Sequence, residues 1–184
     1  MTDNSTERRD AAAGVLGAAT VATGLVAGTF YVFACAVMPA LARSDDRVFI
    51  EVMQNIDEVI QNPVFFLGFL GAPVLTAVAA RQSRGAPERW WVLAALAAYA
   101  LAFVVTVAVN VPLNNGLANA GAPGRIADPA AVRDRFEDPW VAWNVVRALL
   151  STLALACLAR ALLLRRRPQA SAYLASAAGS SASR

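Results

Sequence analysis

Four long runs with almost no charge constrain the fold of this chain more than any other feature of its sequence. Residues 11–42, 59–80 and 90–124 contain no charged residue, and residues 139–159 contain one, Arg147. A helix needs about 20 mostly apolar residues to cross the hydrocarbon core of a bilayer. The sequence therefore predicts an all-α fold, a four-helix transmembrane bundle. Its spans are expected at roughly 11–41, 63–80, 89–112 and 140–164.

The composition of the 184 residues agrees with a membrane protein. Hydrophobic residues make up 58% and charged residues 16%, against about 45–50% and about 25% in soluble domains.

The first run is too long for the apolar region of a signal peptide and no cleavage site follows it, so we expect it to be retained. The chain divides into a cytoplasmic N-terminal tail, a membrane domain and a disordered cytoplasmic tail rich in Ala and Ser. These are residues 1–10, 11–164 and 165–184.

The third run is longer than one span. We expect its helix to end near Val111, because Pro112 disfavours helical geometry in the residue before it and further Asn, Gly and Pro residues follow.

Charge is distributed unevenly between the two sides of the predicted bundle. An even number of spans puts both termini on one side, where nine arginines face four acids; the two long loops on the other side carry five arginines and nine acids. Arginine is enriched in cytoplasmic loops of membrane proteins. We therefore expect a multi-pass protein of the cell membrane with both termini in the cytoplasm.

The first of the two outer loops contains a short amphipathic segment. Within residues 48–60, five apolar residues follow helical spacing, and most acids lie away from them; these are Phe49, Val52, Met53, Ile56 and Ile60. This pattern predicts a short amphipathic helix over the outer face of the bundle.

The basic residues narrow the possible chemistry. All 16 are arginine, and the chain has neither lysine nor histidine. This excludes an imidazole base, a Ser-His or Cys-His nucleophile pair, a Schiff-base lysine and a histidine-ligated metal. Cys35 and Cys157 alone cannot build a cysteine-rich metal site, so we expect no metal and no cofactor. The net charge of +3 does not indicate nucleic-acid binding.

The few polar residues inside the spans form stripes. The third span has Tyr99, Phe103, Thr106 and Asn110 on one face, and Asn114 extends that stripe if the helix bends through Pro112. The fourth span repeats the spacing with Trp140, Asn144, Arg147 and Ser151, and Trp143 lies one turn before Arg147. In the first span, Tyr31 and Cys35 lie above Gly24 and Gly28. The stripes converge in the outer half of the bundle.

Arg147 is the most informative of these residues. An arginine within a span costs at least about 2.5 kcal/mol on insertion scales unless it has a partner, and no span contains an acid. Its partner is then a backbone carbonyl, an anionic ligand or an acid of the outer loops, namely Glu51, Asp57, Glu58 or Glu137. The alternative is a snorkelling or structurally paired arginine. Likewise, the Asn, Trp and Tyr residues of the stripes are either site residues or interhelical and interfacial packing residues.

Four patches of the sequence resemble the anthrone oxygenase-like family of four-span membrane proteins, many of which are recorded only as a domain of unknown function. The patches are 37–41 (VMPAL), 53–56 (MQNI) with 62–65 (NPVF), 110–115 (NVPLNN), and Phe136 with 140–147 (WVAWNVVR). Asp57 follows Ile56 where an asparagine is expected in many relatives.

The resemblance implies oxidation of an anthrone-like aromatic polyketide to a quinone by O2 without a cofactor. Arg147 would stabilise the anthranolate oxygen, with Asn110, Asn114 and Asn144 as hydrogen-bond donors. Tyr31, Glu51 and Asp57 are left open as the group that takes the proton. The substrate would be bound by Trp140, Trp143, Asn114, Asn55, Phe65 and Thr106.

The expected partners are a hydrophobic aromatic molecule, O2 and the lipid bilayer, and association of several copies of the chain is left open. The competing hypothesis is a non-catalytic membrane protein that binds a hydrophobic small molecule, a lipid or a partner subunit.

Overall fold

The computed structural model describes the backbone of residues 3–182 and the side chains of Glu7 and of residues 9–165. Within these residues the chain is helical and contains no strand. The elements are α1 (Asp3–Val32), η1 (Phe33–Val37), α2 (Met38–Leu41), α3 (Asp46–Ile60), α4 (Pro63–Gln82), α5 (Arg89–Val105), η2 (Thr106–Asn110), α6 (Val111–Asn119), η3 (Pro123–Arg125) and α7 (Pro129–Ala182). The all-α prediction is confirmed.

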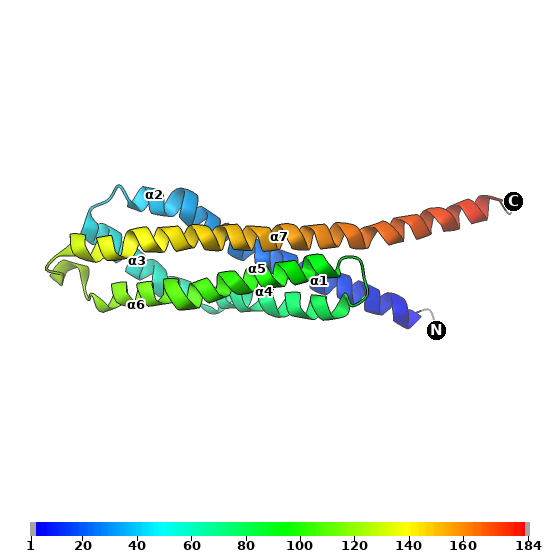
Figure 1. The fold of residues 1–184 in the computed structure, drawn as a ribbon, viewed down its shortest axis with the longest axis horizontal. Coiled ribbons are helices and arrows are strands. Elements are labelled where there is room, and N and C mark those ends of the chain that lie inside the picture. Colours follow the sequence, from blue (N-terminus) through cyan, green and yellow to red (C-terminus); the bar gives the residue numbers. More distant parts are fainter. Residues whose placement is uncertain (1–2, 183–184) are drawn as a thin grey trace.

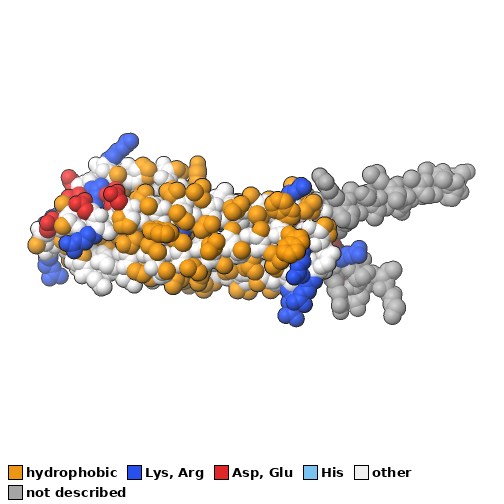
Figure 2. Space-filling view, in the orientation of Figure 1, with side chains coloured by type: hydrophobic (Ala, Val, Ile, Leu, Met, Phe, Trp, Pro, Cys, Tyr) orange, Lys and Arg blue, Asp and Glu red, His pale blue; other side chains and the backbone are white. Residues whose placement is uncertain are grey.

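Four helical stretches are long and apolar enough to cross a membrane: Arg9–Leu41, Pro63–Gln82, Arg89–Asn119 and Pro129–Arg165. They lie side by side in one elongated bundle (Figure 1). In the view of Figure 2, an apolar band covers the middle of the molecule, and charged side chains gather at its two ends. The chain is therefore a multi-pass membrane protein, as the charge-free runs predict.

The two ends of the bundle differ. α1 begins on the side of the bundle where α4 is connected to α5, and α7 continues past that connection; α2, α3 and α6 lie at the opposite end, which we call the outer end (Figure 1). In Figure 2 the acidic side chains appear at the outer end. α7 reaches Ala182, but the side chains after Arg165 and the last two residues lie outside the described part of the chain. The expected disorder of residues 165–184 stays a prediction.

The third span does not end at Pro112, which corrects our expectation. A π-helical turn, η2, precedes α6, and the N–H of Val111 bonds the carbonyl of Thr106, five residues earlier. This change of register makes Pro112 part of the first turn of α6, where the missing N–H of proline costs no helical hydrogen bond. The helix therefore continues to Asn119 and carries Asn114 with it.

A π-helical turn also precedes a proline at the outer end of the first span. The π turn η1 is followed by α2, in which Pro39 again occupies the first turn, and the N–H of Met38 bonds the carbonyl of Phe33. π turns inside α-helices are often found at functional sites. Here they precede α2 and α6, which lie at the outer end.

Helix α4 begins with a side-chain cap. The Oδ1 of Asn62 accepts hydrogen bonds from the N–H groups of Val64 and Phe65, both at 3.0 Å, and Pro63 occupies the first helical position. An asparagine cap followed by proline suits a helix N-terminus because the first N–H groups have no partner within the helix. This cap directs Phe65 into the bundle.

The predicted amphipathic helix is confirmed as α3. Its buried residues are Phe49, Ile50 and Met53, which join an apolar cluster at the outer end with residues of α6 and α7 such as Leu117 and Phe136. α3 therefore covers the outer end of the bundle.

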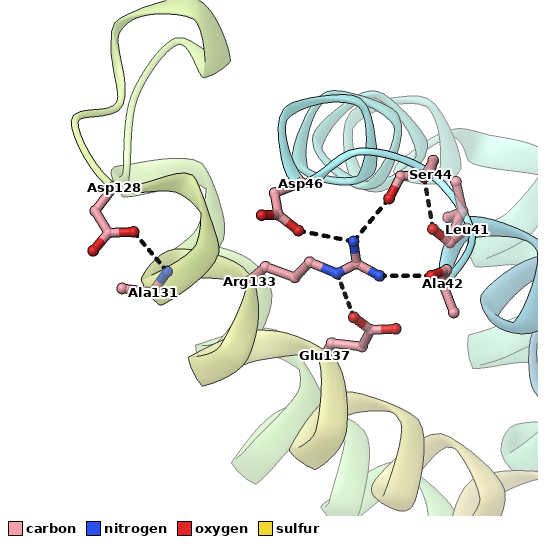
Figure 3. A network of polar contacts seen from close by, with 8 residues as sticks. All are labelled: Leu41, Ala42, Ser44, Asp46, Asp128, Ala131, Arg133 and Glu137. Atoms are coloured by element: carbon pink, nitrogen blue, oxygen red, sulfur yellow. Dashed lines mark hydrogen bonds and ion pairs between the residues drawn. The ribbon is translucent and has the colours of Figure 1, made fainter.

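Arg133 of α7 fastens the beginning of α3 to the bundle (Figure 3). Its guanidinium donates to Asp46 at 2.9 Å, to Glu137 at 2.5 Å and to the carbonyls of Ser44 and Ala42 at 2.9 and 3.1 Å. Since two of these bonds go to backbone carbonyls, they hold the loop before α3 as well as the helix.

Candidate active site

A cavity of about 220 Å³ lies under α3 at the outer end of the bundle. This is several times the ~30 Å³ that one water molecule occupies in the liquid, so the cavity can hold a small organic ligand. Every span contributes to it. The lining residues are Thr29, Phe30, Phe33, Met53, Ile56, Asp57, Ile60, Gln61, Phe65, Phe66, Phe69, Thr106, Val111, Asn114, Asn115, Trp140, Asn144 and Arg147.

Aromatic rings form much of the cavity surface. α4 supplies Phe65 and Phe69, whose rings stack with centroids 5.5 Å apart and planes inclined by 12°. Phe33 packs against Trp140 at a centroid distance of 5.6 Å. A cavity with flat apolar faces and a few convergent polar groups is typical of a site for an aromatic small molecule.

Arg147 brings a buried cation to this apolar cavity. Its side chain is 5% exposed, and its Nη2 donates to Oδ1 of Asn144 at 3.0 Å. The Cζ atom lies 4.4 Å from the ring centroid of Phe30 and 5.3 Å from that of Trp140. These contacts place the charge against the faces of two rings, where cation–π attraction offsets part of its desolvation.

Arg147 has no acidic partner among the described side chains. The ion pairs there join Arg133 to Asp46 and Glu137, and Arg165 to Glu88. The Nε of Arg147 is buried without a hydrogen-bond partner, although a guanidinium carries five N–H donors. A cavity-lining cation with free donors can bind an anion or an oxyanion.

Asn144 holds the arginine in place. Its Nδ2 donates to the backbone carbonyl of Phe30 at 3.0 Å, while its Oδ1 accepts from Arg147. Asn144 is fully buried, so both ends of its amide are used where water cannot replace them. Asn144 thereby links α7 to α1 immediately beside the cation.

A second polar group lies on the α3 side of the cavity. The Nδ2 of Asn114 donates to Oδ1 of Asp57 at 2.5 Å, and the Nε1 of Trp140 donates to Oδ1 of Asn114 at 2.8 Å. Partial burial raises the pKa of Asp57 above its ordinary value, and the hydrogen bond from Asn114 lowers it by a smaller amount. The carboxyl group is therefore a better proton acceptor when ionised than an exposed aspartate.

Comparison with known proteins identifies the family to which this chain belongs. The model of the family described as anthrone oxygenase matches residues 58–157, which is more than half of the chain. The chain belongs to the anthrone oxygenase family. Comparisons with curated proteins and with solved structures give no match. Most residues that line the cavity lie within the stretch matched by the anthrone oxygenase model, among them Phe65, Asn114, Trp140 and Arg147.

Seven residues predicted from the sequence are brought together around the cavity. They are Arg147, Asn144, Trp140, Asn114, Phe65, Thr106 and Asp57. The stripes of the third and fourth spans thus face inward as predicted. Asn110 is also buried, at 1% exposure, but it does not line the cavity, and neither polar atom of its amide has a partner among the described residues.

Four other candidates lie away from the cavity. Tyr31 is 61% exposed and Trp143 is 40% exposed; Asn55 and Glu51 are exposed on α3. None of the four lines the cavity. The predicted inward stripe of the first span is displaced by one residue, because Phe30 is buried in place of Tyr31. In a helix that is apolar all round, no polarity contrast marks the side that faces its neighbours.

The sequence reasoning missed Phe30, Phe33 and Phe69, which line the cavity from α1, η1 and α4. Phe69 lies four residues from the predicted Phe65, so helical spacing could have found it, whereas no predicted residue of the first span pointed to Phe30 or Phe33. Among the described residues, no group of three or more His, Cys, Asp or Glu residues lies close enough together to hold a metal ion.

Proposed function

We propose that this cavity binds an anthrone-like aromatic polyketide and that the protein is an oxidoreductase that converts the substrate to a quinone with O2. The membership of the chain in the anthrone oxygenase family and the aromatic lining of the cavity support this substrate class. The observation that carries the proposal is the buried Arg147, which lines this largely aromatic cavity with an unpaired Nε and with no acidic partner among the described side chains.

The chemistry of an anthrone fits such a site. Removal of a proton from its methylene carbon gives a carbanion whose charge is shared with the carbonyl oxygen opposite. Donors held near that oxygen favour the ionised form, because they stabilise charge that develops as the proton leaves. Arg147 is the donor in this proposal, and Asn144 orients it.

The ionised substrate can itself supply the electrons that O2 accepts. One electron passes to O2, and the resulting radical pair forms a C–O bond at the former methylene carbon. The peroxide then loses water as the second C–H bond and the O–O bond break, which leaves a carbonyl. One anthrone and one O2 give one quinone and one water. The protein contributes orientation and electrostatic stabilisation, for which this chain, without histidine or lysine, has the required groups.

The location of the site follows from the same proposal. In this proposal both termini lie in the cytoplasm and the cavity lies in the outer half of the cell membrane. The distribution of arginines and acids between the two ends supports this orientation.

The decisive experiment measures oxygen uptake and quinone formation by the purified protein in lipid nanodiscs supplied with emodin anthrone. We expect quinone to form faster than in empty nanodiscs, with one O2 consumed per quinone and no hydrogen peroxide released. Metal analysis of the same sample should find less than one iron or copper per chain. Binding of the anthrone without any acceleration over empty nanodiscs would favour the non-catalytic binding protein instead.

A further inference from the structure

Asp57 is the one carboxylate among the residues that line the cavity. It enters from α3, whereas Arg147 enters from α7, and no ion pair joins the two among the described side chains. Glu58, the next residue along the chain, is exposed and does not line the cavity. The cavity therefore presents one anion and one cation that do not neutralise each other.

Trp140 fixes the direction of the hydrogen bonds that reach Asp57. An indole N–H can only donate, so the amide of Asn114 must turn its oxygen toward Trp140, at 2.8 Å. The NH2 group of Asn114 then faces Asp57 and donates to its Oδ1, at 2.5 Å. In this arrangement Oδ1 accepts a hydrogen bond, and the proton-binding position of the carboxylate is Oδ2.

The other contact of the carboxylate is weak. Nε2 of Gln61 lies 3.4 Å from Oδ2 and donates at 3.1 Å to the backbone carbonyl of Asp57. A contact of 3.4 Å is long for a hydrogen bond. Oδ2 is thus the atom of this carboxylate with capacity for a proton from a ligand.

Trp140 and Asn114 connect the two charged groups through a series of contacts. The Cζ of Arg147 lies 5.3 Å from the centroid of the Trp140 ring, and the Nε1 of the same ring leads through Asn114 to Asp57. In an anthrone, the carbonyl and the acidic methylene lie on opposite sides of the central ring. A substrate whose oxygen faces Arg147 would therefore turn its methylene toward the Asp57 side.

The geometry points to Asp57 as the base that removes the methylene proton of the substrate, with Asn114 and Trp140 as its positioning residues. This inference rests on the proposed function. Oδ2 takes the proton as the C–H bond breaks, and the electron pair remains on the anthranolate. After the C–O bond has formed, Asp57 returns that proton to the peroxide anion. The carboxylate then takes the second methylene proton while the O–O bond breaks, and it passes this proton to the departing hydroxide to give water.

The test compares Asp57→Asn with Glu58→Gln in nanodiscs. Asparagine keeps an oxygen that accepts from Asn114, so the cavity should stay intact but without a base. We expect kcat for emodin anthrone to fall by at least about 10²-fold in Asp57→Asn and to stay within twofold in Glu58→Gln. Binding of anthraquinone, measured by quenching of tryptophan fluorescence, should be the same in both variants.

Two further readouts separate a base from a structural residue. Deuterium at the methylene carbon should slow Asp57→Asn more than the wild-type protein, because proton removal becomes limiting. Alkaline pH ionises the anthrone in solution, so it should restore much of the lost rate. Asn114 of α6 and Gln61 of α3 contact the Asp57 carboxylate. Asn115 of α6 and Trp140 and Arg147 of α7 line the same cavity, and apart from Asp57 and Arg147 the cavity-lining residues carry no ionisable group.

The possible outcomes test the assignment of Asp57 as the base separately from the proposed oxidation reaction. If the wild-type protein does not accelerate quinone formation, the proposed function fails and the base assignment fails with it. If the wild type is active and Asp57→Asn has the same kcat, the base assignment alone is wrong. If Asp57→Asn does not bind anthraquinone, Asp57→Glu decides: it keeps a carboxylate and should retain turnover, and a loss as large as that of Asp57→Asn would overturn the inference.

Discussion

The indole N–H of Trp140 donates to Oδ1 of Asn114 at 2.8 Å, and this bond connects the fourth span to the helix that extends the third. It exists because the third span continues through the π turn and Pro112 instead of ending there. The same tryptophan ring faces the guanidinium of Arg147. One side chain thus contacts the two polar groups of the cavity, which makes it a sensitive position for mutation.

Trp140→Phe should lower kcat for emodin anthrone by about 10-fold with a smaller change in KM. Phenylalanine keeps an aromatic face for Arg147 but lacks the N–H that orients Asn114, and a lost hydrogen bond to one neutral partner is worth about 0.5–1.5 kcal/mol. Steady-state kinetics in nanodiscs provide the measurement. Trp143→Phe is the matched control, because Trp143 is 40% exposed and does not line the cavity; an equal loss in both variants would refute the role of Trp140.

Arg147→Met should reduce quinone formation by about 10²–10³-fold, the usual effect of removing one donor from an oxyanion site. Methionine resembles the apolar methylene stem of arginine in length, so the helix should still insert. Arg160→Met removes a charge from the same helix near Trp91, away from the cavity. Comparable activity of Arg147→Met and Arg160→Met would exclude Arg147 as the oxyanion partner.

Asn110→Leu should raise the free energy of unfolding by about 1–3 kcal/mol, because a buried polar group without a partner carries that penalty and leucine has a similar volume. Asn144→Leu should have the opposite effect, since it leaves Arg147 and the carbonyl of Phe30 without their partner. Unfolding of both variants in mixed micelles gives the comparison. A destabilised Asn110→Leu variant would mean that the amide binds water or another group in the folded protein.

Arg133→Gln should loosen α3 without altering the spans. The change removes two ion pairs and the bonds to the carbonyls of Ser44 and Ala42, and hydrogen bonds to charged groups contribute about 1.5–3 kcal/mol each. Hydrogen exchange in α3 and in the loop before it should become faster, and KM should rise. Arg135→Gln is the control because Arg135 is exposed on the same helix; unchanged exchange in Arg133→Gln would contradict the anchoring role.

The stability of the wild-type protein relative to Asp57→Asn should fall as the pH rises. Burial raises the pKa of Asp57 from its ordinary value of 3.8, so between 3.8 and the raised value the folded state holds a proton that the unfolded state has lost. Its contribution to the free energy of unfolding is full below 3.8 and is lost as the pH rises through the raised pKa. Thermal unfolding of both proteins in detergent at pH 3.5 to 7.5 measures the difference in stability. A difference that does not change with pH would show that water solvates Asp57 in the folded protein as it does in the unfolded chain.

The faces of the third and fourth spans could be predicted because their polar residues are rare. Tyr99, Asn110, Asn144 and Arg147 stand out against apolar neighbours, and all four are buried in the bundle. The first span offers no such contrast. Tyr31 has the more polar side chain, but Phe30 is the residue that faces Arg147.

The class of protein, the four spans and the amphipathic helix over the outer end were predictable from the amino-acid sequence, because charge-free length and helical periodicity are local properties. The position of Arg147 within a span was predictable for the same reason. The packing of the helices was needed to show that no described acid pairs with this arginine and that Asp57 lines the cavity in contact with Asn114. These contacts join residues far apart in the chain, and they depend on a π turn that carries the third span past Pro112. The turn keeps Pro112 within a helix because it places the missing N–H of the proline where none is required.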